Sequence, residues 1–220
     1  MKMKKKTVLI TAGPTREYID PVRYISNGSS GKMGYALAEE AKKREADVIL
    51  IIGPTTLKPL KNVKMVNVVS ADEMFNAAKR YFKKADVFIS CAAVCDYKPG
   101  KYSKNKIKKT NKPVTLKLVP NPDILYEVSN RQPPPANHRL IVGFALETEN
   151  LLKNAVSKLE RKNLDMIVAN SPSAMECDNA SGAVITKNKI TKFKKIPKKR
   201  LASLIFDKIL EIMPAKQKFS

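Results

Sequence analysis

Short, mostly apolar runs alternate with amphipathic helical patterns through the first 90 residues, and this alternation is the strongest constraint on the fold of the chain. The runs span residues 7–11, 47–52, 63–69 and 86–90, and the helical patterns cover about 31–44 and 71–84. Buried strands separated by helices are typical of a parallel sheet with helices on both faces. We therefore predict an α/β fold with a Rossmann-like, doubly wound parallel sheet.

The second half of the chain continues this pattern and adds an arm. Strands are expected at 140–144 and 165–170, a helix around 152–159, a hairpin at 183–185 and 190–193, and a last helix at about 199–212. Residues 114–119 alternate with period two, as in a half-buried antiparallel strand. Residues 98–112 hold seven lysines and few apolar residues, so by themselves they indicate a solvated, mobile loop. We predict a single domain, 1–220, with a flap and an antiparallel arm at about 98–120.

Residues 23–34 have the composition of an anion site. Gly28 and Gly31 let the backbone approach a ligand, and Ser29 and Ser30 offer hydroxyl and N–H groups. The helix expected to follow points its positive end at this stretch. A phosphate or a carboxylate is therefore the ligand that the stretch favours.

Two other interpretations of this stretch can be weighed. Ser29 or Ser30 could simply cap the following helix, which is the commoner role of serine before an apolar pattern. A Walker-type P-loop is excluded, because Ser26 stands where that motif requires glycine and Met33 where it requires serine or threonine. The choice between a helix cap and an anion site stays open on this stretch alone.

The formal net charge of +22 raises the question of nucleic-acid binding. Aromatic residues make up only 6% of the chain and are not interleaved with the basic runs, as a base-stacking surface would require. We expect most of the charge to be solvated surface that steers phosphorylated substrates, and no nucleic acid as partner. A basic nucleic-acid-binding module is kept as the rival hypothesis.

A Rossmann-like sheet also suggests an NAD(P)-dependent oxidoreductase. The first strand, however, is followed by Ala12, Gly13, Pro14 and Thr15 and not by a G-x-G-x-x-G turn. The second strand ends at Gly53 with no acidic residue to hold a ribose. Both marks of dinucleotide binding are missing, and the oxidoreductase is disfavoured.

Cysteine content and hydropathy bear on the compartment. Cys91, Cys95 and Cys177 form no C-x-x-C pair and are too few for a disulfide scaffold, so we expect core thiols in a reducing environment. No apolar run approaches membrane-spanning length, and the basic start leads into a strand pattern and not into a secretory segment. The expected location is the cytoplasm, without a membrane partner.

Several motifs in order along the chain carry a family resemblance. Residues 7–34 combine a strand, a Gly-Pro-Thr turn and Ile-Ser-Asn-Gly-Ser-Ser-Gly-Lys-Met-Gly; Ala-Ala-Val-Cys-Asp-Tyr-Lys-Pro, Asn-Pro-Asp-Ile, Gly-Phe-Ala-Leu-Glu-Thr and Asp-Met-Ile-Val-Ala-Asn follow. Together they closely resemble phosphopantothenate cysteine ligase, the coenzyme A biosynthesis enzyme. The resemblance covers residues 7 to about 213, and suggests a stand-alone form without the flavin-dependent decarboxylase part of many bacterial relatives.

The resemblance implies a nucleotide pocket. Its expected residues are Gly13, Ser29, Ser30, Ser90, Cys91, Ala92, Asp96, Lys106, Pro122, Asp123, Ile124, Leu125, Phe144, Lys158 and Lys162. Phe144 would line the base pocket, and Lys158 and Lys162, four apart on a helix, would hold the triphosphate. Outside this context the two lysines would be solvated, and Asp96 and Asp123 would serve as turn or helix-cap residues.

The resemblance also implies the catalytic residues. Lys106 falls on the family's Lys-x-Lys-Lys motif, on a flap that closes over the site, where a cation would offset the charge of two reacting anions. Asn27 is expected to hold the carbonyl of an acyl-nucleotide through its neutral amide. Arg23 is expected to help bind the substrate anion.

The implied reaction joins 4′-phosphopantothenate and L-cysteine through phosphopantothenoyl-CMP. CTP is the expected nucleotide, ATP stays possible, and Mg²⁺ is expected with the triphosphate, although the sequence contains no dedicated metal site. The arms are expected to pair two subunits into a homodimer. A separate phosphopantothenoylcysteine decarboxylase as partner and the role of the insertion at 131–135 stay open.

Overall fold

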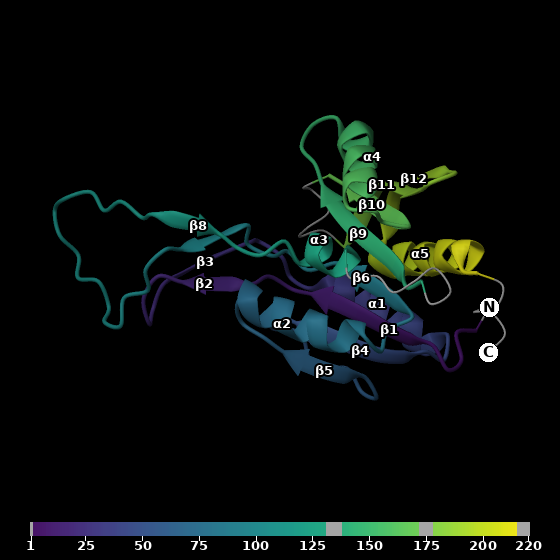
Figure 1. The fold of residues 1–220 in the computed structure, drawn as a ribbon, viewed down its shortest axis with the longest axis horizontal. Coiled ribbons are helices and arrows are strands. Elements are labelled where there is room, and N and C mark those ends of the chain that lie inside the picture. Colours follow the sequence, from purple (N-terminus) through teal and green to yellow (C-terminus); the bar gives the residue numbers. More distant parts are fainter. Residues whose placement is uncertain (1, 131–137, 172–177, 215–220) are drawn as a thin grey trace.

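The computed structural model describes residues 2–130, 138–171 and 178–214, and its centre is one eight-stranded sheet (Figure 1). The strand order is β12-β11-β10-β9-β6-β1-β4-β5. The strands are β1 (Thr7–Ala12), β4 (Asp47–Ile52), β5 (Lys64–Asn67), β6 (Val87–Ser90), β9 (Leu140–Leu146), β10 (Met166–Asn170), β11 (Asn179–Thr186) and β12 (Ile190–Pro197). The six strands from β10 to β5 are parallel, in the 3-2-1-4-5-6 order of a Rossmann sheet. The predicted doubly wound fold is confirmed.

Helices cover both faces of this sheet. On one face lie α1 (Lys32–Lys43) and α5 (Lys198–Ile212), and on the other α2 (Ala71–Phe82), α3 (Ile124–Ser129) and α4 (Leu151–Arg161). Because side chains alternate along a strand, Val8 and Ile10 of β1 pack toward α1 and α5 while Leu9 packs toward α2. β1, buried from Val8 to Ala12, therefore belongs to both cores.

The end of the chain differs in detail from the expectation. The hairpin β11–β12 is longer than predicted and extends the sheet with two antiparallel strands beyond β10. The last helix, α5, begins at Lys198 and packs on α1, where Arg44 bonds to Ser203 and Asp207. None of the described helices could span the apolar interior of a bilayer. The insertion at 131–135 and Cys177 lie outside the described residues.

An arm leaves the carboxyl edge of the sheet beside β1 and β6. It consists of the hairpin β2 (Arg16–Tyr18) and β3 (Tyr24–Ser26), the pair β7 (Tyr97–Pro99) and β8 (Leu118–Pro120), and the long loop between β7 and β8. Figure 1 shows the arm projecting well away from the body of the molecule. The flap and arm predicted at about 98–120 thus form a structure outside the parallel sheet.

The predicted half-buried strand at 114–119 is wrong for most of its length. Only Leu118 and Val119 of that run are in β8, which pairs with β7, and Val114, Leu116 and Leu118 are all exposed. Period-two alternation describes a strand that has one covered face. Within this chain no described element covers residues 114–117, so their apolar side chains have no surface to pack on.

Candidate active site

A cavity of about 460 Å³ opens at the carboxyl ends of β1 and β6. This edge is the topological switch point of the sheet, because the chain runs from β1 toward β4 and β5 on one side and later to β6 and β9 on the other. The cavity wall includes these predicted site residues: Gly13, Asn27, Ser29, Ser30, Ser90, Cys91, Ala92, Asp96, Pro122, Asp123, Ile124, Leu125, Phe144, Lys158 and Lys162. Arg23 and Lys106 do not line it.

The amino end of α1 forms one wall of the cavity. Gly31 is its N-cap, with φ 79°, so the alternative in which Ser29 or Ser30 is the cap residue is wrong. The two serine hydroxyls make only long contacts, accepting the N–H groups of Gly31 at 3.4 Å and Lys32 at 3.5 Å. Gly34 lies against β1 so closely that a Cβ atom there would come within 2.2 Å of the Ala12 Cβ. The uncapped N–H groups of the first turn therefore face a ligand site, held close to the sheet.

Asn27 ties this wall to the segment after β6. Its amide nitrogen donates to the carbonyl oxygens of Ala93 at 3.0 Å and Val94 at 3.1 Å. Both hydrogens of the amide are thus engaged with backbone. The predicted role of Asn27 toward an acyl-nucleotide carbonyl requires at least one of these bonds to be exchanged for the ligand.

Lys158 and Lys162 of α4 form the opposite wall. Lys158 donates from Nζ to the Phe144 carbonyl at 2.8 Å, and Lys162 Nζ lies 2.7 Å from an Asp123 carboxylate oxygen. Asp123 also caps α3 by accepting from the Tyr126 N–H at 3.0 Å. The two lysines therefore face the cavity, and Asp123 acts both as a cap and as an ion-pair partner.

The charges of this wall influence one another. Burial alone would raise the pKa of Asp123, but the Lys162 ammonium and the Tyr126 N–H outweigh it and lower that pKa. Burial, and then the neighbouring Lys162, lower the pKa of Lys158 below its ordinary value. An anion bound between the two lysines would relieve their repulsion and favour the charged form of Lys158.

For the nucleotide that the sequence predicts as ligand, affinity should fall as the pH rises through the lowered pKa of Lys158. Only the ammonium form attracts a triphosphate, and its lowered pKa means that the form is lost at a lower pH than for an exposed lysine. The measurement is the nucleotide KM against pH. Lys158→Met should raise the nucleotide KM by about 10- to 100-fold, which is the effect of losing one charged hydrogen bond. The rise of KM at alkaline pH should then disappear. If KM still rose with pH in the variant as in wild type, the rise would not be due to Lys158.

The thiols differ from the expectation. Cys95 is a core thiol with 5% of its surface exposed, as predicted. Cys91 lines the cavity with the other predicted pocket residues, but it is only half-buried and so is not the core thiol that was expected. Burial of the sulfur raises the pKa of Cys91 to about 12, so it stays a neutral thiol near pH 7. Its contribution to the cavity is therefore shape and not nucleophilic chemistry.

Four polar residues of the cavity wall were not among the predicted site residues: Lys32, Asn121, Asn170 and Lys198. Lys32 is paired with Asp178 at 2.8 Å, and the buried Oδ1 of Asn170 has no hydrogen-bond partner. Lys198, 8% exposed, is the first residue of α5, where a cation opposes the helix dipole. A lysine at the start of a predicted helix is unfavourable, and this was the only feature of the sequence that could have pointed to Lys198. Asn170 could have been found because it ends a predicted parallel strand, and the carboxyl ends of those strands form the edge at which the cavity lies.

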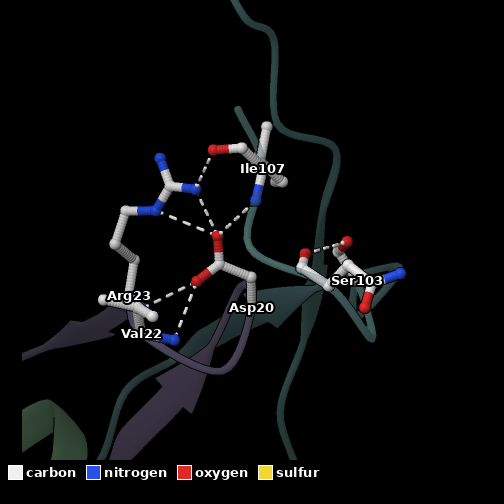
Figure 2. A network of polar contacts seen from close by, with 6 residues as sticks. Asp20, Val22, Arg23, Ser103 and Ile107 are labelled. Atoms are coloured by element: carbon white, nitrogen blue, oxygen red, sulfur yellow. Dashed lines mark hydrogen bonds and ion pairs between the residues drawn. The ribbon is translucent and has the colours of Figure 1, made fainter. Parts of the chain in front are cut away.

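Arg23 and Lys106 lie together on the arm. Figure 2 shows the Arg23 guanidinium paired with the Asp20 carboxylate, and its Nη2 donates to the Ile107 carbonyl at 2.7 Å. Lys106 is the exposed residue next to Ile107. The structure therefore brings the two predicted catalytic cations close in space but outside the cavity of their own chain.

Comparison with known proteins identifies relatives of nearly the whole chain. Residues 3–213 match the family described as DNA/pantothenate metabolism flavoprotein C-terminal domain. The coenzyme A biosynthesis bifunctional protein CoaBC of Haemophilus influenzae is 47% identical over 212 residues, which are 96% of this chain and 52% of that protein. The chain thus spans about half the length of this relative.

Solved structures have the same fold. A crystal structure of the C-terminal domain of CoaBC has a TM-score of 0.81 at 37% identity, covering 94% of this chain and 95% of that one. A Cab2 mutant in complex with phosphopantothenate-cysteine has a TM-score of 0.76, covering 92% of this chain and 86% of its own, and at 17% identity it bears on the fold alone.

The family match, the H. influenzae relative and the CoaBC domain all extend over the sheet, the arm and the cavity described above. The resemblance found in the motifs of the sequence is confirmed at the level of family and fold. The chain belongs to the DNA/pantothenate metabolism flavoprotein C-terminal domain family.

Proposed function

We propose that this chain ligates 4′-phosphopantothenate to L-cysteine, as a step of coenzyme A biosynthesis, with CTP as the activating nucleotide. The observation that carries the proposal is the cavity, which sets the uncapped amino end of α1 and Asn27 opposite the Lys158 and Lys162 pair. Such a site suits a substrate with two anionic groups. The name of the H. influenzae relative supports coenzyme A biosynthesis as the pathway.

The proposed chemistry has two steps. The carboxylate oxygen of 4′-phosphopantothenate attacks the α-phosphorus of CTP, the bond to the bridging oxygen breaks, and pyrophosphate leaves. The cysteine amine then attacks the acyl carbon of phosphopantothenoyl-CMP, expels CMP and loses a proton. Activation is needed because a carboxylate is a poor acyl electrophile, and the mixed anhydride must be kept from water.

The described residues supply charge and orientation for these steps. Lys158 and Lys162 would hold the triphosphate, and the first-turn N–H groups of α1 would take a second anion. Phe144 and the small residues after β6 leave space for the base. Lys106 would neutralise charge that develops on the phosphoryl oxygens as the two anions meet.

A magnesium ion would accompany the triphosphate. Within the described parts of the chain no three acidic, histidine or cysteine residues gather into a metal site. Mg²⁺ held mainly by phosphate oxygens and water needs only one or two carboxylates, and the exposed Asp96 on the cavity wall offers one. The donor set thus fits an ion brought by the substrate, which would supply further charge neutralisation.

Pyrophosphate release tests the proposal. Purified protein with Mg²⁺ and 4′-phosphopantothenate is given CTP or ATP, each with and without cysteine. Release that needs phosphopantothenate, and that continues over many turnovers only with cysteine, would support both steps and identify the base. No release with either nucleotide would refute the ligase, and salt-sensitive DNA binding would then be measured for the rival module.

We also propose that the active form is a homodimer in which each arm reaches the cavity of the other subunit. Arg23 and Lys106 lie on the arm and outside their own cavity. The arm carries most of the exposed large apolar side chains of the described residues: Tyr18, Val22, Tyr24, Tyr97, Tyr102, Val114, Leu116 and Leu118. A protein surface with this much clustered apolar area is typical of an interface.

Charge on the arm should therefore dissociate the dimer. Leu116→Lys with Leu118→Lys places two cations on the apolar surface, so light scattering should report a monomer and pyrophosphate release should be lost. The matched control is Ile190→Lys, which changes an equally exposed apolar residue on β12. A double variant that stays dimeric and active would contradict the arm-mediated assembly.

A further inference from the structure

Asp20 is a fully buried carboxylate in the turn between β2 and β3 of the arm, and its two oxygens have different partners. Oδ1 accepts the N–H groups of Val22 and Arg23, each at 2.9 Å, and so closes a local turn. Oδ2 accepts the N–H of Ile107 at 3.1 Å and pairs with the Arg23 guanidinium. One oxygen thus organises the turn, while the other reaches a residue 87 positions further along the chain.

Both backbone groups of Ile107 are held by this ion pair. Asp20 takes its N–H, and Arg23 Nη2 donates to its C=O at 2.7 Å, as Figure 2 shows. The Arg23 guanidinium and the backbone N–H groups keep the pKa of Asp20 far below its usual range, so the carboxylate is charged at any pH where the enzyme would work. An ionised carboxylate is also the side chain best able to accept four hydrogen bonds at once.

The rest of the flap has few other anchors. Ile107 is half-buried, whereas Lys106 and Lys108 on either side of it are exposed. Ser103, four residues before Ile107, donates its N–H to the Ile19 carbonyl at 2.9 Å. The position of Lys106 along the arm is thus set mainly by the bonds to its neighbour Ile107.

From this geometry we propose that Asp20 is a positioning residue for Lys106, acting with Arg23 to clamp the flap backbone at Ile107. The inference rests on the proposed function for the role of Lys106, but the clamp itself is a property of the arm. It assigns Arg23 a structural partner in addition to the anion binding expected from its motif. Misplacing a reacting group by about 1 Å can cost about 100-fold in rate, which is the effect such a clamp prevents.

The variant Asp20→Asn separates the clamp from the turn. Its Oδ1 can still accept from Val22 and Arg23, whereas the amide nitrogen that replaces Oδ2 is a donor and cannot accept from Ile107 or Arg23. The turn should persist and the flap should come free. Asp207→Asn is the matched control, because it removes another aspartate–arginine pair, to Arg44, on α5.

Two readouts test the proposal. Tryptic cleavage after Lys106, Lys108 and Lys109, followed by mass spectrometry, should be about tenfold faster or more in Asp20→Asn than in wild type or Asp207→Asn. In the pyrophosphate assay kcat should fall about 10- to 100-fold with little change in the KM for CTP. In a Lys106→Gln background, assayed with enough enzyme to measure the residual rate, Asp20→Asn should add no further loss.

If trypsin cleaved the flap of Asp20→Asn no faster than that of wild type, the proposal that Asp20 clamps the flap would be wrong. An equal loss of kcat with and without Lys106 would show a general structural effect and would overturn the positioning role. A wild-type protein without ligase activity would refute the proposed function instead, and the cleavage rates would still decide whether Asp20 holds the flap.

Discussion

Asn27→Asp should reduce ligation by at least about 100-fold while the protein stays folded. The change places carboxylate oxygens where the amide now donates to the carbonyls of Ala93 and Val94, so two hydrogen bonds become repulsive contacts. The new charge would also oppose the anionic substrates in the cavity. Losing one oriented donor at a reacting carbonyl costs about 10²- to 10³-fold in comparable sites. The measurement is the kcat for pyrophosphate release with saturating CTP.

The stability of this variant should fall by no more than about 1 kcal/mol, because Asn27 is exposed and water can solvate the new carboxylate and the two released carbonyls. Its thermal midpoint, measured beside the activity, separates a catalytic effect from unfolding. Asn76→Asp makes the same charge change on an exposed face of α2 and should keep full activity. Turnover of Asn27→Asp at the wild-type rate would remove Asn27 from the site.

Lys106→Gln should lower kcat by about 10²- to 10³-fold and leave the KM for CTP nearly unchanged. Lys106 does not line the cavity that holds Lys158 and Lys162, so in the proposed dimer those two lysines would carry the triphosphate and Lys106 would add little to nucleotide binding in the ground state. Its proposed contribution is to the transition state, where charge develops on the phosphoryl oxygens. Steady-state kinetics with each substrate varied in turn give the required separation of kcat from KM.

The nearby Lys104→Gln provides the control, since it removes an equally exposed flap cation without altering the residue next to Ile107. It should retain wild-type kinetics. If both variants lost the same activity, general flap charge and not Lys106 would be responsible. If neither lost activity, the catalytic role of Lys106 would be wrong.

The sheet could be predicted from the sequence because its strands are apolar on both faces and separated by helices. Val8, Leu9 and Ile10 are all buried, so the run is apolar whichever side a residue faces. The alternation with helices then leaves few topologies, and the Rossmann order is one of the common ones. The cavity at the switch point follows from that order.

The arm could not be predicted to the same degree, because its interactions are set at long range. Period two at 114–119 predicted a covered strand, but no described part of this chain packs on Val114 or Leu116. No expectation for Asp20 followed from the sequence, because its bond to Ile107, 87 positions away, depends on how the arm folds back. Lys198 likewise reaches the cavity only through the packing of α5 on α1.

The packing of α5 also determines when the site can form during synthesis. The cavity wall draws residues from both ends of the chain, from Gly13 after the first strand to Lys198 at the start of the last described helix. Arg44 at the end of α1 bonds to Ser203 and Asp207 of α5, so these elements secure each other. Domains generally fold as units as they emerge from the ribosome. A nascent chain therefore exposes the amino end of α1 long before Lys198 has been made, and the wall of the cavity is complete only once α5 has been released and has docked.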